Sequence, residues 1–422
     1  MLFASKRAVR MVLTLLAFSF VATAGFSRTF YDVSRVNPFD WWLLLGIVII
    51  QIRVLPYWIE GSLVILATAL FSFCAFDLRG LEPALSSVCC YAGLSSWAVL
   101  ALRTIWATPE TNVRVGLLPA LIASCLFIGF TYLAAPVLYY AEQLQPNTLD
   151  LYLISFDGSL GFQPSFLVGK YYWGFPWLRH VALLAYLGLP LALALTYVEN
   201  LTRRRERAAS VGMGMFYLGL VGIFAYNLFP ATGPVHVFGG LFPGHPLGTE
   251  QARTLPLSSI PVTGSRNAIP SLHMAWILWC WWWVRGLQPW LKAIILWFVL
   301  FTVVATLGTG EHYLIDLVVA LPFTLMICAA FTPAVPWRNA DRLTALIAGL
   351  VGTLLWFVLL RHTPRLFWIS PAVPWAMVLA TLVLVYWLKF RLFRSLDALA
   401  PLAASSSVPD LSSADVASSS AV

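Results

Sequence analysis

Residues Arg266 to Trp283 read RNAIPSLHMAWILWCWWW. The stretch opens with polar residues and continues as an almost unbroken run of apolar and tryptophan side chains. Such a run indicates a helix that enters a membrane. The polar residues then lie where this helix meets the membrane surface. The question is what function polar residues have at this position.

The whole chain has the composition of a membrane protein. Of its 422 residues, 60% are hydrophobic and 10% are charged, and the mean hydropathy is +0.82. Soluble domains carry roughly 25% charged residues, so this chain cannot hide its apolar surface by folding alone in water. The six cysteines lie in apolar stretches without the spacing of a zinc site or a disulfide framework. We interpret them as small hydrophobic residues.

Apolar spans follow one another along the chain and predict an all-α polytopic transmembrane bundle. They lie near 11–28, 41–55, 57–77, 84–106, 115–140, 178–198, 209–229, 271–285, 290–308, 312–333, 343–361 and 372–390. The first span follows a basic start and precedes a small-residue ATA, so it could be a cleaved signal peptide. We favour a retained helix. The Ser/Ala-rich tail from about 396 predicts disorder.

Basic clusters predict the orientation of the bundle. KRAVR (6–10), RRRER (203–207) and KFRLFR (389–394) fall at alternate ends of the spans, whereas fewer basic residues fall at the other ends. These ends and both termini are therefore expected to face the cytoplasm. The same clusters explain the net charge of +8, so we expect no nucleic-acid partner. Two loops rich in Pro, Gly and aromatic residues, 141–177 and 230–270, then face outward.

Two histidine motifs end on this outer side. PSLH (Pro270 to His273) stands where the second outer loop enters a span, and GEHYLID (Gly310 to Asp316) follows one helical hairpin later. His312 and Asp316 are four residues apart, which predicts that they share one face of a helix. A buried carboxylate needs a partner. Asp316 would orient His312 as a nucleophile, and His273 would transfer a proton.

The polar residues of the opening stretch predict an anion site. Ser271 and the start of its helix favour phosphate, while Arg266 and Asn267 could reach phosphate oxygens. A His–Asp pair could instead be structural or half of a metal site. A third metal ligand is not apparent, because Glu311 is expected to face away from the pair. We therefore expect no metal.

These motifs resemble the type-2 phosphatidic acid phosphatase superfamily. PSLH with HYLID is similar to its inositol phosphorylceramide synthase-like branch, as are NLFPATGPVHVFG (227–239) and DGSLGF (157–162). The resemblance implies that His312 forms a phosphohistidine, Asp316 orients it and His273 protonates the leaving group, without a cofactor. It implies a six-helix catalytic core at 111–335, accessory helices at 1–110, two further helices at 336–395 and a disordered tail at 396–422.

The sequence departs from the phosphatases of this superfamily in two places. The loop before PSLH contains NLFPATGP in place of a Lys/Arg motif, and Ala305 and Thr306 occupy the place of a Ser-Arg pair. Arg266 is the obvious remaining cation. This pattern favours a phosphodiester headgroup, which carries less charge than a phosphomonoester.

Three functions remain open from the sequence. The first is a lipid phosphotransferase that passes a phospho-headgroup from a phospholipid to a ceramide or diacylglycerol. The second is a phosphatase of phosphatidate or polyprenyl diphosphate that uses water. The third is a non-enzymatic transporter-like bundle or scaffold, which the complete set of His273, His312 and Asp316 disfavours. We expect membrane lipids as partners, no required protein partner, and a location in a bacterial inner membrane with the site outside.

Overall fold

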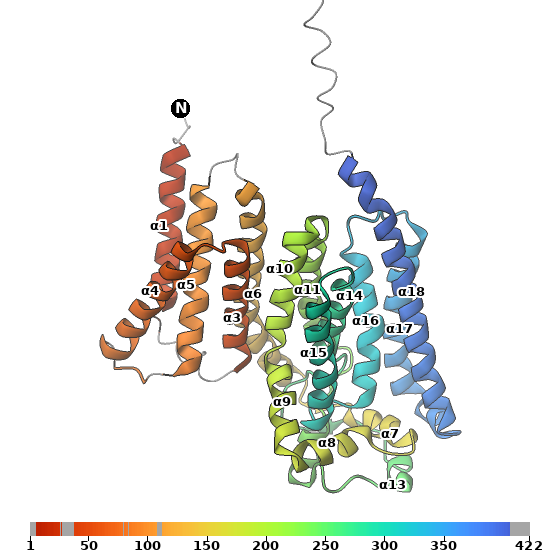
Figure 1. The fold of residues 1–422 in the computed structure, drawn as a ribbon. Helices are drawn as coiled ribbons and strands as arrows, with labels where there is room; N and C mark the ends of the chain where they lie inside the picture. The colour runs from red at the N-terminus through yellow and green to blue at the C-terminus, as the bar shows by residue number, and fades with distance from the viewer. Residues whose placement is uncertain are drawn as a thin grey trace, which may run out of the picture.

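The computed structural model describes residues 6–25, 27, 38–78, 80–82, 84–107 and 112–405. It is a bundle of helices with one two-residue strand pair in the part of the chain that it describes (Figure 1). Six helices are long and apolar enough to cross a membrane, and a bent pair makes a seventh. The predicted helical membrane fold is therefore confirmed.

The N-terminal helices form a group of their own beside the larger part of the bundle (Figure 1). They are α1 (Lys6–Gly25), α3 (Pro38–Val54), α4 (Trp58–Phe73) with the π-helical turn η1 (Cys74–Leu78), α5 (Leu85–Trp106) and α6 (Asn112–Leu144). The helix α3 packs on α5, α6 and α10, and one hydrophobic core runs from this group into the larger one. The accessory helices are thus joined to the rest through packed side chains.

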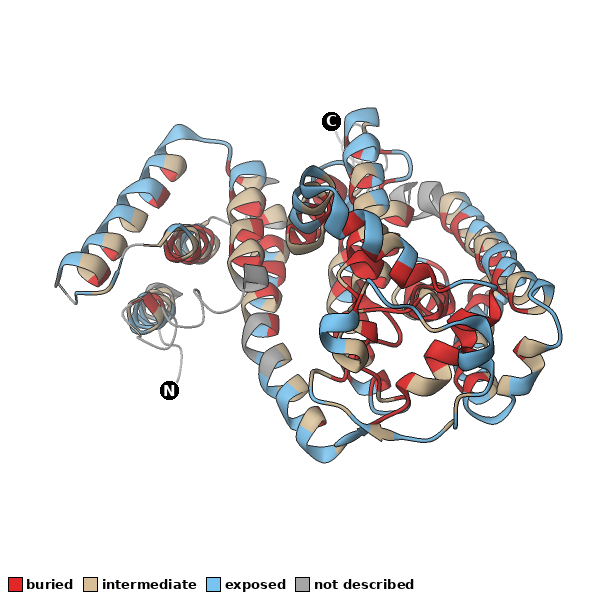
Figure 2. Cartoon of the chain, turned by 90° about the horizontal axis from the view of Figure 1, so that it is seen from below, coloured by how far each residue is buried: buried red, intermediate tan, exposed pale blue. Residues whose placement is uncertain are grey.

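The larger group holds the remaining spans. They are α9 (Pro176–Leu187), α10 (Leu189–Arg203), α11 (Arg205–Ala225), α14 (Leu272–Trp283), α15 (Pro289–Gly308), α16 (Leu314–Ala330), α17 (Ala340–His362) and α18 (Ala372–Ser405). The axes of α9 and α10 differ by 49° at the break between them. Buried residues concentrate inside this group, and exposed residues lie on its outer faces (Figure 2). Exposed apolar residues such as Leu350 and Val383 suit contact with lipid tails.

The helix α14 is a buried core element. At 12 residues it is about 18 Å long, too short to cross a bilayer of about 30 Å. Its tryptophans Trp279, Trp282 and Trp283 are fully buried. Neighbouring helices therefore surround α14, the helix that begins within the PSLH motif.

The two outer loops are structured, as their composition predicts. They contain β1 (Asn147–Thr148), α7 (Asp150–Ser159), α8 (Pro164–Gly174), α12 (Pro234–Phe238), the 3₁₀ turn η2 (Gly239–Leu241), α13 (Thr249–Arg253) and β2 (Ile260–Pro261). The strands pair antiparallel, with Asn147 opposite Pro261. A further 3₁₀ turn, η3 (Pro364–Trp368), lies at the same end and packs against α7. Together these elements cover one end of the bundle (Figure 1).

The expected start of the disordered tail at 396 was wrong, because α18 continues to Ser405. Leu392, Phe393 and Leu396 are buried, and Asp397 pairs with Arg207 at 2.8 Å and with Arg285 at 2.6 Å. These contacts hold α18 in place around residue 396, and composition alone does not reveal them. Residues 406–422 lie outside the described part of the chain.

Candidate active site

The two histidine motifs meet at the end of the bundle that the outer loops cover. The Nε2 atom of His312 lies 3.3 Å from the Ser271 hydroxyl, and its Nδ1 atom lies 2.8 Å from the carbonyl oxygen of Ala268. A carbonyl only accepts hydrogen bonds, so Nδ1 must carry the proton. The lone pair of Nε2 then faces the Ser271 hydroxyl.

Asp316 lies beside the same imidazole but in a different setting from the predicted one. His312 precedes the helix, which begins at Leu314, so the pair does not share a helix face. The Oδ2 atom of Asp316 accepts from the backbone N–H of Tyr313 at 2.8 Å and lies 3.4 Å from Nδ1 of His312. The carboxylate therefore caps α16, while the nearer carbonyl of Ala268 fixes the tautomer.

Ser271 connects both motifs. It is the N-cap of α14, and its hydroxyl accepts from the backbone N–H of Met274 at 3.4 Å. Its own N–H donates to the carbonyl of Asp316 at 3.1 Å. The start of α14 consequently faces His312, and a helix N-terminus attracts anions.

His273 occupies the first turn of α14, next to this site. Its ring stacks on Tyr186 of α9, with ring centroids 3.8 Å apart and an angle of 15° between the planes. It is close enough to His312 for the two rings to interact electrostatically. The structure thus brings His273, His312 and Asp316 to one place.

Arg266 lies elsewhere than the sequence indicates. Its guanidinium donates to the carbonyls of Gln145 and Pro146 at 2.9 Å each, and to that of Gly264. The residue is 2% exposed. All three guanidinium nitrogens bind loop carbonyls, so Arg266 fastens one outer loop to the other. We therefore revise its predicted role as a phosphate ligand.

Asn267 and Glu311 border the site without touching His312 through any hydrogen bond found in the described residues. The side-chain oxygen of Asn267 is buried and has no partner there. Glu311 faces His236 of the second outer loop, 3.4 Å from its Nε2 atom, and this hydrogen bond raises the pKa of His236. Glu311 thus belongs to the loop contacts around the site.

Two buried aspartates hold the His312 segment and were not predicted. Asp150 accepts from the backbone N–H groups of Thr232 and Gly233 and, at 3.0 Å, from the hydroxyl of Tyr313. Asp157 accepts from the backbone N–H of Leu314 at 3.0 Å. Both lie on α7. Acidic residues in the apolar stretch TLDLYLISFDGS were the available signal.

Burial changes the acidity of Asp157. The carboxyl is 2% exposed, and its Oδ1 atom has no partner in the described residues. Burial raises the pKa of Asp157 to about 8, opposed by the Leu314 N–H and reinforced by the charge of Asp316. Burial thus favours the protonated form of this carboxyl.

Close backbone packing completes the site. Gly233 has φ of 105°, and a Cβ atom there would lie 2.3 Å from the carbonyl oxygen of Glu311. Ser165 donates its hydroxyl hydrogen to the carbonyl of His312 at 2.8 Å. Only glycine fits at 233, and the backbone of the His312 segment is fixed from both sides. No group of three or more His, Cys, Asp or Glu suited to a metal ion occurs in the described ranges.

A helical membrane bundle that presents an oriented histidine at a helix N-terminus has the features of a phosphatase or phosphotransferase. Residues 151–330 match a family model of the PAP2 superfamily. The match runs from α7 to α16 and includes both histidine motifs, and it supports a phosphatase or phosphotransferase enzyme. No curated protein and no solved structure gives a significant match.

Proposed function

We propose that the chain is a membrane lipid phosphotransferase that moves a phospho-headgroup through His312 to a lipid alcohol. The supporting observation is the carbonyl of Ala268, 2.8 Å from Nδ1. It holds the proton on Nδ1 and leaves the lone pair on Nε2, beside Ser271 and the start of α14. A phosphate at this helix end would meet the nucleophile directly.

The reaction follows in two balanced steps. Nε2 of His312 attacks phosphorus, the P–N bond forms, and the bond from phosphorus to the donor's lipid oxygen breaks. His273 gives that oxygen its proton. The acceptor hydroxyl then attacks phosphorus, passes its proton to His273 and breaks the P–N bond. Asp316, 3.4 Å from Nδ1, offsets the positive charge of the phosphorylated ring.

The charge around His312 supports a transferase acting on phosphodiesters. With Arg266 bound to loop carbonyls, the hydrogen-bond partner of Nε2 found in the described residues is the Ser271 hydroxyl at the N-terminus of α14. Such uncharged donors suit a phosphodiester with one negative charge better than a phosphomonoester with nearly two. We therefore favour a reaction like that of inositol phosphorylceramide synthases.

Asp150 and Asp157 act as positioning residues in this proposal. They bind the Tyr313 hydroxyl and the Leu314 N–H, the two residues that follow His312. Nucleophilic catalysis depends on the distance and angle of attack. A fixed backbone at this point keeps Nε2 on the line to the phosphate.

The basic helix ends lie away from His312, at the end where α18 finishes. Arg203 and Arg53 pair with Glu199 there, and Arg207 and Arg285 pair with Asp397. This arrangement supports, through the positive-inside rule, a catalytic site on the outer side of the membrane. We propose a bacterial inner membrane as the location.

Transfer and hydrolysis are separated by one experiment. The purified chain is placed in vesicles with phosphatidylinositol labelled in its headgroup, together with ceramide or with a diacylglycerol whose acyl chains differ from those of the donor. We expect the labelled phospho-headgroup to appear on the added lipid alcohol, and no product with His312→Ala. Release of water-soluble phosphate or inositol phosphate, without lipid product, would establish the phosphatase alternative instead.

A further inference from the structure

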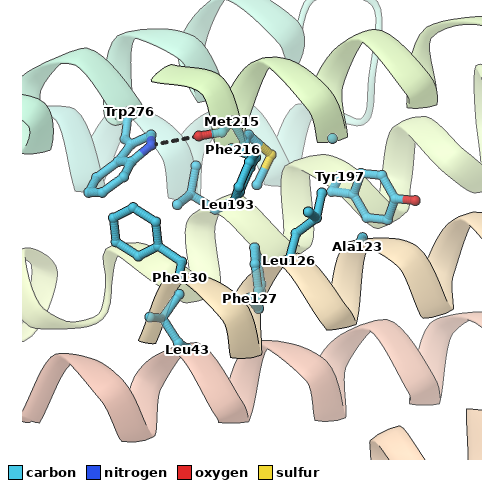
Figure 3. A pocket seen from close by; sticks show the side chains of 11 residues that line it. Leu43, Ala123, Leu126, Phe127, Phe130, Leu193, Tyr197, Met215, Phe216 and Trp276 are labelled. Atoms are coloured by element: carbon cyan, nitrogen blue, oxygen red, sulfur yellow. Dashed lines mark hydrogen bonds between the residues drawn. The ribbon is translucent and has the colours of Figure 1, made fainter. Parts of the chain in front are cut away.

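An apolar pocket lies between the accessory helices and the catalytic helices (Figure 3). Its enclosed volume is about 30 Å³, and about 470 Å³ is reached only when the space at its open side is counted, so the pocket is an open groove rather than a closed cavity. The helices α3, α6, α10, α11 and α14 all contribute to its wall. The lining residues are Leu43, Ala123, Leu126, Phe127, Phe130, Leu193, Tyr197, Gly212, Met215, Phe216 and Trp276.

The wall is suited to hydrocarbon. Its two side chains with polar atoms already bind the backbone, since the Tyr197 hydroxyl donates to the carbonyl of Pro119 at 2.7 Å and the indole N–H of Trp276 donates to that of Met215 at 3.0 Å (Figure 3). The other lining side chains are aliphatic or aromatic, apart from one glycine. A ligand with a charged or hydrogen-bonding part would lose its hydration here without replacement.

The pocket begins next to the catalytic helix turn. Trp276 stands three residues after His273, and the two rings meet edge to face at 6.3 Å. Phe130 also packs edge to face with Trp276, with ring centroids 5.3 Å apart. From Phe130 the lining on α6 continues to Ala123, a distance of about 10 Å along the helix.

The direction of the pocket is set by α10. Its lining residues Leu193 and Tyr197 lead towards Arg203 at the end of that helix, opposite to the site. The pocket therefore runs from the neighbourhood of His273 into the interior of the membrane-spanning part. A straight hydrocarbon chain attached to a headgroup at His273 would follow the same line.

We infer that this pocket holds one hydrocarbon tail of the lipid whose headgroup reacts at His273 and His312. The identity of the reacting headgroup rests on the proposed function. The binding of a hydrocarbon tail is inferred from the pocket alone. Lipid hydrocarbon is the apolar ligand that a membrane supplies around the open side. Leu43 on α3 and the α6 residues lie outside the matched segment 151–330, so helices that precede this segment supply part of the tail site.

Photolabelling tests the tail site without relying on turnover. The full chain is reconstituted in phosphatidylcholine bilayers with a trace of phosphatidylinositol that carries a diazirine in one acyl chain. After illumination, labelled residues are mapped by mass spectrometry. We expect labelling of Leu126, Met215 and Phe216 to exceed severalfold that of the lipid-exposed Leu382 and Val383 on α18.

Neighbouring substitutions on α6 give the matched control. Ala123→Phe fills the pocket and should lower the pocket labelling severalfold, whereas Ile122→Phe, on the exposed side of the same helix, should leave it unchanged. Leu126→Trp, at a half-buried lining position, serves if Ala123→Phe does not fold. Even labelling of all lipid-facing helices, unchanged by the filling variant, would overturn the tail site.

The inactive variant His312→Ala separates this inference from the proposed function. It should keep the full pocket labelling, because the tail site lies on helices that His312 does not belong to. Loss of transfer with retained labelling would leave the tail site intact. Normal transfer without pocket labelling would reject the tail site alone.

Discussion

The Nε2 atom of His312 lies 3.3 Å from the hydroxyl oxygen of Ser271, although 41 positions separate the two residues in the chain. The helical hairpin of α14 and α15 brings them together, and the Ser271 N–H to Asp316 carbonyl bond of 3.1 Å closes the junction. The proposed nucleophile and the helix N-terminus that would receive phosphate are thus held by the same contacts.

Replacing either histidine should stop turnover while the protein still inserts and folds. His312→Ala removes the nucleophile, and His273→Ala removes an acid–base group of the kind that contributes about 10²- to 10⁴-fold in rate. The two act on one phosphoryl group, so the double variant should be little slower than His312→Ala. The rate of headgroup transfer measures this.

The phosphoryl adduct distinguishes the two histidines. Only His312→Ala should abolish an acid-labile label on the protein after incubation with a phosphorus-labelled donor lipid. The adduct should still form, slowly, with His273→Ala. Label that persists on His312→Ala would move the nucleophile to another residue.

Activity should survive removal of divalent metals. The proposed chemistry uses His312, His273 and Asp316 and passes no step through an ion. Transfer rates before and after treatment with EDTA should therefore agree. Complete loss that zinc restores would favour the metal interpretation of the His312–Asp316 pair.

Labelling with membrane-impermeant thiol reagents tests which side of the membrane each loop faces. In a variant without the natural cysteines, Gly240→Cys, in the exposed part of the second outer loop, should react from outside intact cells. Thr202→Cys, at the exposed basic end of α10, should react only after the membrane is opened. The reverse pattern would place the catalytic site in the cytoplasm.

The sequence was sufficient for the helices and for the meeting of the two motifs. Apolar spans correspond to α1, α3 and the helices that follow because each needs internal hydrogen bonds in lipid. One hairpin between PSLH and HYLID is enough to bring His273 and His312 to one end of the bundle. Both inferences depend on patterns that are local in the chain.

The loops could not be predicted in the same way. The Ala268 carbonyl at His312 and the Asp150 contacts with Thr232 and Tyr313 join segments that are far apart in sequence. Backbone carbonyls carry no signal of their own in a sequence. Arg266 is an example. Its position beside PSLH suggests phosphate binding, and only the structure shows that its guanidinium binds backbone carbonyls instead.

Arg266 should matter for stability more than for phosphate affinity. Arg266→Lys removes the planar group that reaches three carbonyls, at a cost of about 1 to 3 kcal/mol. We expect a lower midpoint of thermal unfolding in detergent and unchanged KM for the folded fraction. The exposed Arg253→Lys is the control. A stable variant with a strongly raised KM would restore Arg266 to the phosphate site.

Asp157 should make the stability of the protein depend on pH. Its pKa is about 8 in the folded chain, against about 3.8 for a carboxyl in water, so between these values the folded state holds a proton that the unfolded state has lost. The free energy of unfolding that depends on this carboxyl is therefore highest below about pH 4. It decreases as the pH rises to about 8 and no longer changes above that pH.

Asp157→Asn should remove that dependence, because the amide resembles the protonated carboxyl and cannot ionise. Thermal unfolding of the variant and of the unmodified chain is compared at pH 5 and pH 9. We expect the variant to gain stability relative to the unmodified chain on going to pH 9. Glu250→Gln, whose parent side chain is 79% exposed, should show no such change. An equal difference at both pH values would mean that Asp157 is ionised in the folded protein, and its bond to the Leu314 N–H would then be that of a carboxylate.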